Sequence, residues 1–206
     1  MRNNQPDITK FQNVVISNEE APPELQVSSI YGNHNPLEVD IGSGKGRFLL
    51  ARANGHPTTN YLGIERQLGR VYRAAKKATH LNIENVKLCR VEAMVGLSAI
   101  LPNESVTTFY IFFPDPWPKR RHLQRRLVSP PFLDLLHSKL IPKGCIHFAT
   151  DHQDYADVVG ERFAADARFK STTAFQPTED ERTDFELIFT GQNKTISRYS
   201  IQKRQA

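Results

Sequence analysis

Short apolar segments alternate with amphipathic stretches over most of the chain. Runs of largely apolar residues predict five strands, at Leu37–Ile41, Asn60–Ile64, Val86–Val91, Thr107–Phe113 and Cys145–Thr150. Apolar residues at helical spacing predict helices between them, at Arg47–Asn54, Leu68–Ala78, Pro130–Leu140 and Tyr155–Phe163. Strands that alternate with helices are typical of an α/β fold, in which helices cover both faces of a mostly parallel sheet. Such sheets bind ligands at the carboxyl ends of their strands.

The C-terminal part of the chain has a different pattern. Two strand-like runs, Phe185–Thr190 and Thr195–Ile201, flank the polar segment Gly191–Lys194. This arrangement is typical of an antiparallel hairpin. We therefore expect the parallel sheet to be completed by a C-terminal antiparallel pair.

The first 30 residues lack this periodicity. Residues 1–30 are polar and interrupted by Pro6, Pro22 and Pro23, and we expect them to form a flexible arm. Residues 31–206 carry the alternating pattern and are expected to form a single domain.

Composition narrows the class of protein. No apolar run is long enough to span a membrane, and the N-terminus lacks a secretory pattern, so we expect a cytoplasmic protein without a membrane partner. Cys89 and Cys145 both lie in predicted strands and are expected to be buried thiols. No metal site is expected, and the sequence leaves monomer or homodimer undecided.

Positive charge is concentrated in one segment. The net charge is +5, and the segment Lys119–Arg126 has the sequence KRRHLQRR. A solvated surface is the ordinary interpretation of a charge run, and a polyanionic partner is the other. The segment directly follows a loop rich in aromatic residues and proline, which favours the second interpretation.

A glycine loop follows the first strand. Its sequence from Asp40 is DIGSGKG, so Gly42 and Gly44 are spaced as in a dinucleotide fingerprint, but Arg47 stands where that fingerprint has its third glycine. A phosphate-binding loop is excluded as well, because no Lys-Ser/Thr pair follows. The pattern favours a ligand that lies against the loop without phosphates, and a simple strand-to-helix turn is the alternative.

Carboxylates follow the next two strands. Glu65 closes the second strand, where it can accept hydrogen bonds from both hydroxyls of a ribose, or alternatively satisfy backbone N–H groups at a helix start. Glu92 follows the third strand, where an adenine would lie, and a plain surface position is the alternative.

The loop after the fourth strand is the most specific segment. From Phe112 it has the sequence FFPDPWPK, so that two prolines flank Asp115 and the only tryptophan, Trp117, follows. Proline fixes its own φ and restricts the residue before it. A rigid aromatic loop at this end of a central strand indicates a functional site, and a tryptophan that covers the core is the alternative.

The stretch Phe113–Leu127, FPDPWPKRRHLQRRL, resembles the signature of the bacterial tRNA (guanine-N7-)-methyltransferases of the TrmB family. The similarity runs from about Tyr31 to the C-terminus and includes Gly42–Gly46, Gly63–Glu65, Thr150–Asp151 and Thr183–Glu186. It implies a seven-stranded, Rossmann-like methyltransferase fold that binds S-adenosyl-L-methionine (AdoMet), and methylation of a guanine in the variable loop of tRNA.

The resemblance also assigns residues to the two ligands. It implies AdoMet contacts at Asp40, Glu65, Glu92 and Asp115, to which the glycine loop adds Gly42 and Gly44 as expected cofactor-binding residues. It implies tRNA contacts at Lys119, Asp151, Thr183, Asp184, Phe185 and Glu186. Apart from the resemblance, the guanidinium groups of Arg125 and Arg126 are suited to backbone phosphates of tRNA. Two positions depart from the family pattern: Asp40 stands where glutamate is more common, and Glu92 where aspartate or asparagine is more common.

The expected chemistry needs few catalytic groups. N7 of guanine has a lone pair and no proton, so methyl transfer to it requires alignment and no general base. During the transfer a positive charge moves from the cofactor sulfur to the guanine ring. A carboxylate near both groups stabilises this charge before and after the transfer and therefore accelerates the reaction little. We therefore expect Asp115 to orient guanine or the cofactor. The alternatives are an AdoMet-dependent methyltransferase for another RNA base, and an inactive RNA-binding relative.

Overall fold

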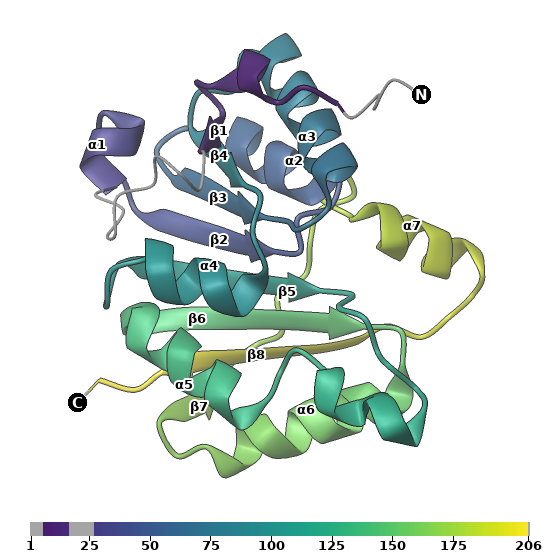
Figure 1. The fold of residues 1–206 in the computed structure, drawn as a ribbon. Helices are drawn as coiled ribbons and strands as arrows, with labels where there is room; N and C mark the ends of the chain where they lie inside the picture. The colour runs from purple at the N-terminus through teal and green to yellow at the C-terminus, as the bar shows by residue number, and fades with distance from the viewer. Residues whose placement is uncertain (1–5, 17–26, 206) are drawn as a thin grey trace. The chain divides into compact units, whose positions relative to one another are not determined.

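The computed structural model describes residues 6–16 and 27–205. The chain forms two compact units, residues 1–102 and 103–206. Figure 1 labels the helices and strands of both.

The first unit contains a parallel sheet. Its strands lie in the order β1 (Val15–Ile16), β4 (Val86–Cys89), β3 (Asn60–Ile64) and β2 (Leu37–Ile41). In the register of these strands Asp40 lies beside Gly63, and Gly63 lies beside Leu88. A Cβ at Gly63 would approach the side chains of Leu49 and Leu88 within 2.6 and 2.8 Å. A larger residue at this position would therefore displace these packed side chains, and glycine lets helix and strand pack closely beside Asp40.

Helices cover this sheet. The helices of the first unit are α1 (Val27–Tyr31), α2 (Arg47–Gly55), α3 (Leu68–His80) and α4 (Ala93–Ile100). α2 and α3 bury alanines and aliphatic side chains in one cluster with β3 and β4, including Leu49, Ala74, Ala75, Val86 and Leu88. The predicted helix that begins at Leu68 is present as α3, and its buried residues are Val71, Ala74, Ala75 and Ala78.

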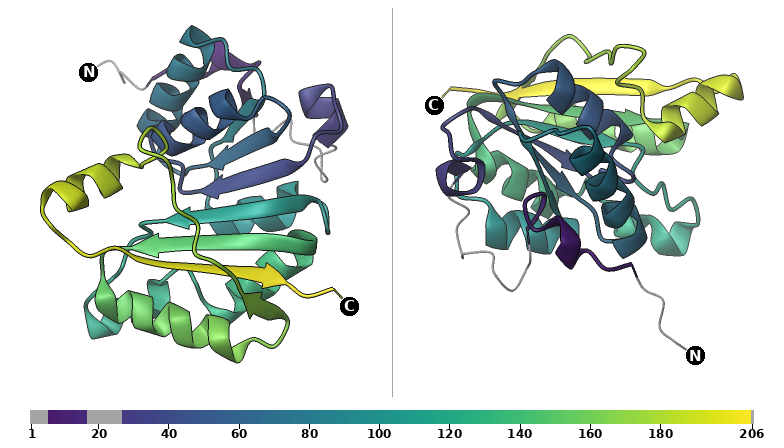
Figure 2. Two further views of the ribbon diagram at one scale, coloured as in Figure 1. Left: turned by 180° about the vertical axis from the view of Figure 1, so that it is seen from behind. Right: turned by 90° about the horizontal axis from the view of Figure 1, so that it is seen from above.

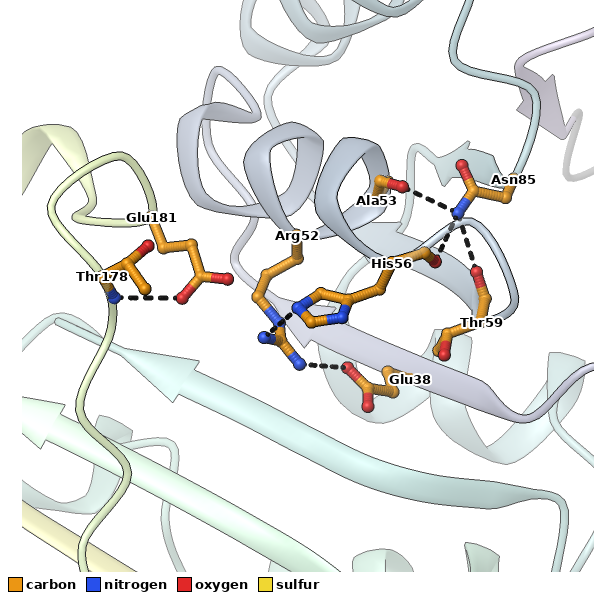
Figure 3. Close-up of polar contacts among 8 residues, drawn as sticks. All are labelled: Glu38, Arg52, Ala53, His56, Thr59, Asn85, Thr178 and Glu181. Carbon is orange, nitrogen blue, oxygen red and sulfur yellow. Dashed lines mark hydrogen bonds and ion pairs between the residues drawn. The ribbon is translucent and has the colours of Figure 1, made fainter.

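Asn85 fixes the connection between α2 and β3. Its amide nitrogen donates to the carbonyl oxygens of Ala53, His56 and Thr59 at 2.9, 3.1 and 2.8 Å (Figure 3). Arg52 on the same helix lies 2.7 Å from the His56 ring nitrogen and 3.5 Å from the Glu38 carboxylate. The turn that leads into β3 is thereby held against the end of α2.

The second unit has a mixed sheet. Its strands lie in the order β5 (Val106–Phe112), β6 (Leu140–Thr150), β8 (Ser197–Lys203) and β7 (Phe169–Ser171). β5 and β6 are parallel, whereas β8 is antiparallel to both β6 and β7. The predicted antiparallel completion of the sheet is thus present.

The helices of this unit are the 3₁₀ helix η2 (Arg120–Arg125), α5 (Pro130–Lys139), α6 (Gln153–Ala165) and α7 (Asp184–Gly191). α7 leads into β8, whose first residue, Ser197, pairs with Thr150 at the carboxyl end of β6. Figure 2 shows α7 beyond that end of the strands, separate from α5 and α6.

The prediction of a Phe185–Thr190 strand is wrong. These residues belong to α7, and the strand antiparallel to β8 at its outer edge is β7, which the sequence pattern did not indicate. The cause is a helix cap: the hydroxyl of Thr183 accepts a hydrogen bond from the backbone N–H of Glu186 at 3.0 Å. A threonine followed three positions later by glutamate is typical of a helix start.

The N-terminal segment also differs from its prediction as a flexible arm. Residues 9–11 form the 3₁₀ helix η1 (Thr9–Phe11), and β1 pairs with β4 at Leu88 and Cys89. Val14 and Val15 are 7% and 8% exposed and belong to the core cluster. The segment 17–26, with Pro22 and Pro23, lies outside the described residues. β1 is the reason that the described residues contain eight strands rather than seven.

Other predicted elements are found with small shifts. β2 and β3 have the predicted bounds, whereas β4 ends at Cys89 instead of Val91. Cys89 is buried as expected, but Cys145 is only partly buried, because it lies near the start of the paired part of β6.

Candidate functional site

The glycine loop joins β2 to α2. Gly42, Gly44 and Gly46 have φ values of +83°, +57° and +78°, which non-glycine residues adopt rarely. The N–H groups of Gly42 and Ser43 donate to the carbonyl oxygen of Ile64 at the end of β3, at 2.8 and 3.1 Å. A Cβ at Gly46 would lie 2.9 Å from the Ala74 side chain, so Gly46 allows the close helix packing for which a dinucleotide fingerprint uses its third glycine.

Glu65 lies under this loop. It is 5% exposed, and its carboxylate accepts hydrogen bonds from the N–H groups of Gly44 at 3.2 Å and Gln67 at 2.8 Å. Arg70 on α3 approaches the same carboxylate at 3.5 Å. Gln67 is the N-cap of α3, so Glu65 does satisfy a backbone donor at a helix start, and it also ties the glycine loop to that helix.

Asp40 is the second buried carboxyl group beside the loop. It is 4% exposed near the end of β2. Burial, and to a smaller extent the negative charge of Glu65, raises the pKa of Asp40 from 3.8 to about 8. A cation placed beside Asp40 would favour the ionised carboxylate, so the site is suited to a positively charged ligand.

The loop fits AdoMet by three further observations. A Cβ at Gly42 would have no neighbour within 4 Å, and one at Gly44 would meet only the Gly42 carbonyl oxygen, at 3.9 Å. The hydroxyl of Ser43 is buried without a hydrogen-bond partner among the described residues. The backbone is thus open where a ligand would lie, and an unused polar atom adjoins it.

Glu92 is exposed, unlike the buried carboxyl groups of Asp40 and Glu65. It lies at the N-cap of α4, and its carboxylate accepts a hydrogen bond from Val95 N–H at 3.2 Å. The strand before it ends at Cys89, so Glu92 belongs to the start of a helix that the periodicity did not predict. Capping accounts for this carboxylate without a ligand.

The loop after β5 is strained at two aromatic residues. Phe113 and Trp117 have φ values of +53° and +43°, and each directly precedes a proline. Proline normally keeps the preceding residue extended, and both Phe113 and Trp117 depart from this. Such conformations cost about 1–3 kcal/mol each and are found mainly at functional sites. Asp115 lies exposed between them.

Contacts at both ends hold this loop. Phe113 N–H donates to the Ala149 carbonyl oxygen at 2.8 Å, and the rings of Phe113 and Phe189 are 5.6 Å apart. Trp117 packs its edge against His122, with ring centroids 5.5 Å apart, and the guanidinium of Arg125 lies 5.1 Å from its ring. The tryptophan therefore packs on the basic segment that follows it.

The basic segment exposes most of its charges. Lys119, Arg120, Arg121 and Arg125 are exposed. Arg126 is only 6% exposed, and its guanidinium donates to the backbone carbonyl oxygens of Pro116 and Asp154. Arg126 is thus bonded to backbone carbonyl oxygens of the chain, whereas Arg125 is exposed and lies against the Trp117 ring.

Two acidic residues of the predicted tRNA site are ion-paired. Asp151 follows β6 and lies 2.6 Å from Lys194 Nζ, whereas His152 is the N-cap of α6. Glu186 is 5% exposed and forms an ion pair with Arg198 of β8. Both pairs connect the segment around α7 to the sheet of the second unit.

The start of α7 carries the other predicted contacts. Thr183 caps the helix, Asp184 is partly buried in its first turn, and Phe185 is 42% exposed and stacks on Phe189 with ring centroids 5.9 Å apart. The sequence pattern missed the partners Lys194 and Arg198, for which it contains no local signal. The Thr-x-x-Glu cap was visible in the sequence.

Residues 6–16 and 27–205 contain neither a metal-binding cluster nor a membrane-spanning helix. No group of three His, Cys, Asp or Glu side chains lies close enough together to hold a metal ion. No helix there has the length and apolar character needed to cross a membrane.

The chain is similar to known proteins in both sequence and fold. A family model described as "Putative methyltransferase" matches residues 34–200. A tRNA (guanine-N(7)-)-methyltransferase from Halorhodospira halophila is 39% identical over 167 residues, which are 79% of this chain and 72% of the relative. The solved structure of the 16S rRNA methyltransferase KamB has a TM-score of 0.65 at 15% identity, covering 92% of this chain and 95% of its own.

A second solved structure, of a Streptococcus mutans protein in complex with SAH, has a TM-score of 0.54 at 13% identity. The match covers 82% of this chain and 89% of that one. These similarities confirm the predicted mostly parallel α/β fold with its antiparallel C-terminal part.

Proposed function

Because the chain belongs to the tRNA (guanine-N(7)-)-methyltransferase family, we propose that it transfers the methyl group of AdoMet to N7 of a guanine in the variable loop of tRNA. The observation that carries this proposal is the pair of buried carboxyl groups, Asp40 and Glu65, beside an open glycine loop. We place the activity in the cytoplasm, the compartment of the tRNA substrate.

The first unit holds the cofactor in this proposal. Glu65 accepts hydrogen bonds from the ribose hydroxyls, which replace its present bonds to backbone N–H groups. Asp40 faces the positive charge of the ligand, and Gly42 and Gly44 allow the ligand to approach the backbone. Glu92 is exposed at the start of α4 and, in addition to capping that helix, contributes an adenine contact. When bound, AdoMet supplies an electrophilic methyl group on a positively charged sulfur.

The second unit recognises the tRNA in this proposal. The exposed side chains of Lys119 and Arg125 bind backbone phosphates, and Asp115 accepts hydrogen bonds from the N1–H and the exocyclic amine of guanine. Asp151 and the segment Thr183–Glu186 contribute further contacts at the start of α7. No proton has to leave N7, so none of these groups acts as a base.

Nucleoside analysis tests the function directly. Transfer RNA incubated with the protein and AdoMet is expected to gain one methylated nucleoside that coelutes with 7-methylguanosine in mass spectrometry after digestion. An Asp40→Asn, Glu65→Gln double variant, which should no longer hold the cofactor, is the control. Methylation of another base would favour the alternative methyltransferase function, and no methylation would favour the inactive RNA-binding relative.

The raised pKa of Asp40 gives a pH dependence. The unfolded chain releases this proton near pH 4, whereas the folded, unliganded protein keeps it up to about pH 8, so Asp40 makes the protein less stable as pH rises from 4 to 8. Binding of a cationic ligand requires the ionised form. We therefore expect AdoMet affinity to rise by up to about tenfold per pH unit from pH 6 to 8 and to level off above it.

Calorimetry at several pH values measures this effect. Asp40→Asn is expected to remove both the pH dependence of AdoMet affinity and the loss of thermal stability between pH 4 and 8. A wild-type affinity that does not change between pH 6 and 8 would contradict the assignment of Asp40 to the cationic part of the ligand.

A further inference from the structure

Arg126 is the buried member of the basic segment. It follows the 3₁₀ helix η2 and is 6% exposed, whereas its neighbour Arg125 is exposed. Its Nε donates to the Pro116 carbonyl oxygen at 2.8 Å, and its Nη1 lies 3.4 Å from the Asp154 carbonyl oxygen in the first turn of α6. The guanidinium carbon lies 4.8 Å from the ring centroid of Tyr155. Arg126 therefore connects the loop after β5 to α6.

The surroundings of Arg126 stabilise a buried guanidinium. Tyr155 is fully buried, and its hydroxyl accepts a hydrogen bond from Val128 N–H at 3.1 Å, which fixes the ring under the guanidinium. Within the described part of the chain Arg126 forms no ion pair with a carboxylate. Its charge is instead stabilised by carbonyl dipoles and the aromatic face. A guanidinium held in this way has no exposed pair of donors for a phosphate.

The carbonyl that Arg126 holds lies at the centre of the loop. Pro116 stands between Asp115 and Trp117, and Trp117 is one of the two residues with a strained positive φ. The direction of the Pro116 carbonyl fixes the peptide plane between Pro116 and Trp117. Since a strained conformation persists only where its surroundings hold it, removal of this hydrogen bond should allow the loop to relax.

We infer that Arg126 is a positioning residue, which holds Asp115 and Trp117 in place through the Pro116 carbonyl and does not bind RNA. The inference rests on the proposed function, because Asp115 is there the group that orients guanine. It assigns different roles to two adjacent arginines: Arg125 binds the tRNA backbone, and Arg126 maintains the conformation of the loop. A displacement of a reacting group by about 1 Å can lower a rate about 100-fold.

Kinetics of adjacent variants test this separation. Arg126→Ala is expected to lower the single-turnover rate at saturating tRNA and AdoMet by about tenfold to 100-fold, with unchanged KM for tRNA and an unchanged salt dependence of binding. Arg125→Ala is expected to weaken tRNA binding and to reduce the log–log salt slope by about 0.7–0.9. Lys170→Ala, which removes one exposed charge from β7, is the charge-matched control and should behave as wild type.

Trp117 supplies a readout that does not depend on activity. It is the only tryptophan of the chain, so the intrinsic tryptophan fluorescence reports on this loop alone. Arg126→Ala is expected to shift the emission and to increase quenching by acrylamide, while AdoMet affinity stays unchanged. Arg126→Lys keeps a donor for the Pro116 carbonyl and should recover part of both the rate and the fluorescence. If Arg126→Ala does not fold, the rate and fluorescence of Arg126→Lys and Arg126→Gln are compared with those of the wild type instead.

Two results would overturn the inference. One is a wild-type rate and fluorescence in the folded Arg126 variants, and the other is a reduced salt slope with an unchanged rate at saturating tRNA, which would make Arg126 an RNA contact. Wild-type protein that methylates no tRNA would instead contradict the proposed function, and the fluorescence comparison would still test the positioning role.

Discussion

A tRNA that carries 7-deazaguanine at the target position is expected to bind the protein with nearly normal affinity and to accept no methyl group. The substitution replaces only N7 by carbon and removes the lone pair that attacks the methyl carbon. The phosphates that Lys119 and Arg125 are proposed to bind are unchanged, and so are the N1–H and exocyclic amine that Asp115 is proposed to bind. The loss should therefore be confined to the chemical step.

Single-turnover assays with labelled AdoMet and filter binding measure these two quantities separately. Normal tRNA of the same sequence is the control. With it, the rate at saturating AdoMet should be nearly constant from about pH 6.5 to 8.5, because no proton leaves N7 and the effect of Asp40 is confined to cofactor binding. Methyl transfer to the deaza substrate, or a rate that rises tenfold per pH unit, would place the methyl group on another atom and require a base.

The parallel part of the fold was predictable because its signals are local. Buried parallel strands are continuous apolar runs, and β2 and β3 were found with the predicted bounds. The run from Phe185 to Thr190 has the aromatic and β-branched composition of a strand, and only the cap by Thr183 decides for a helix. The pairing of β1 depends on a long-range contact with β4, and a strand of two residues carries no periodicity.

The geometry of the candidate site was predictable only where its sequence signals are local. The glycine loop and the end of β3 each form a short sequence signal, and their chemistry follows from the topology of a parallel sheet. In the basic segment, by contrast, the local sequence does not distinguish exposed from buried residues. Arg125 and Arg126 are adjacent and chemically identical, but one is exposed and the other is buried under Tyr155, which lies 29 positions further along the chain. Only the tertiary contacts distinguish the two arginines.

The ion pairs of Glu186 and Asp151 could not be predicted from the local sequence either. Nothing near Glu186 or Asp151 in the sequence identifies Arg198 and Lys194 as their partners. Lys194 lies in the turn before β8 and Arg198 lies in β8 itself, so only the tertiary structure brings them beside Asp151 and Glu186.

Replacement of Asp115 by asparagine is expected to lower the rate of methyl transfer by about tenfold to 150-fold, which corresponds to the loss of about 1.5–3 kcal/mol from hydrogen bonds to a charged group. Asp115 lies exposed in the loop between the strained residues Phe113 and Trp117. Its carboxylate can accept from both the N1–H and the exocyclic amine of guanine, whereas an asparagine side chain presents one acceptor and a donor that opposes guanine. The exposed Asp180→Asn serves as the control for loss of a carboxylate elsewhere in the same unit.

A double-mutant cycle distinguishes guanine from the cofactor as the partner of Asp115. A tRNA with inosine at the target position lacks the exocyclic amine but keeps N1–H and N7. If Asp115 binds that amine, inosine should lower the wild-type rate clearly and the Asp115→Asn rate much less, because the contact is already lost. Calorimetry should show unchanged AdoMet affinity in the variant. Additive effects of inosine and Asp115→Asn, together with weakened AdoMet binding, would instead assign this carboxylate to the cofactor, and Arg126 would then hold a cofactor contact in place.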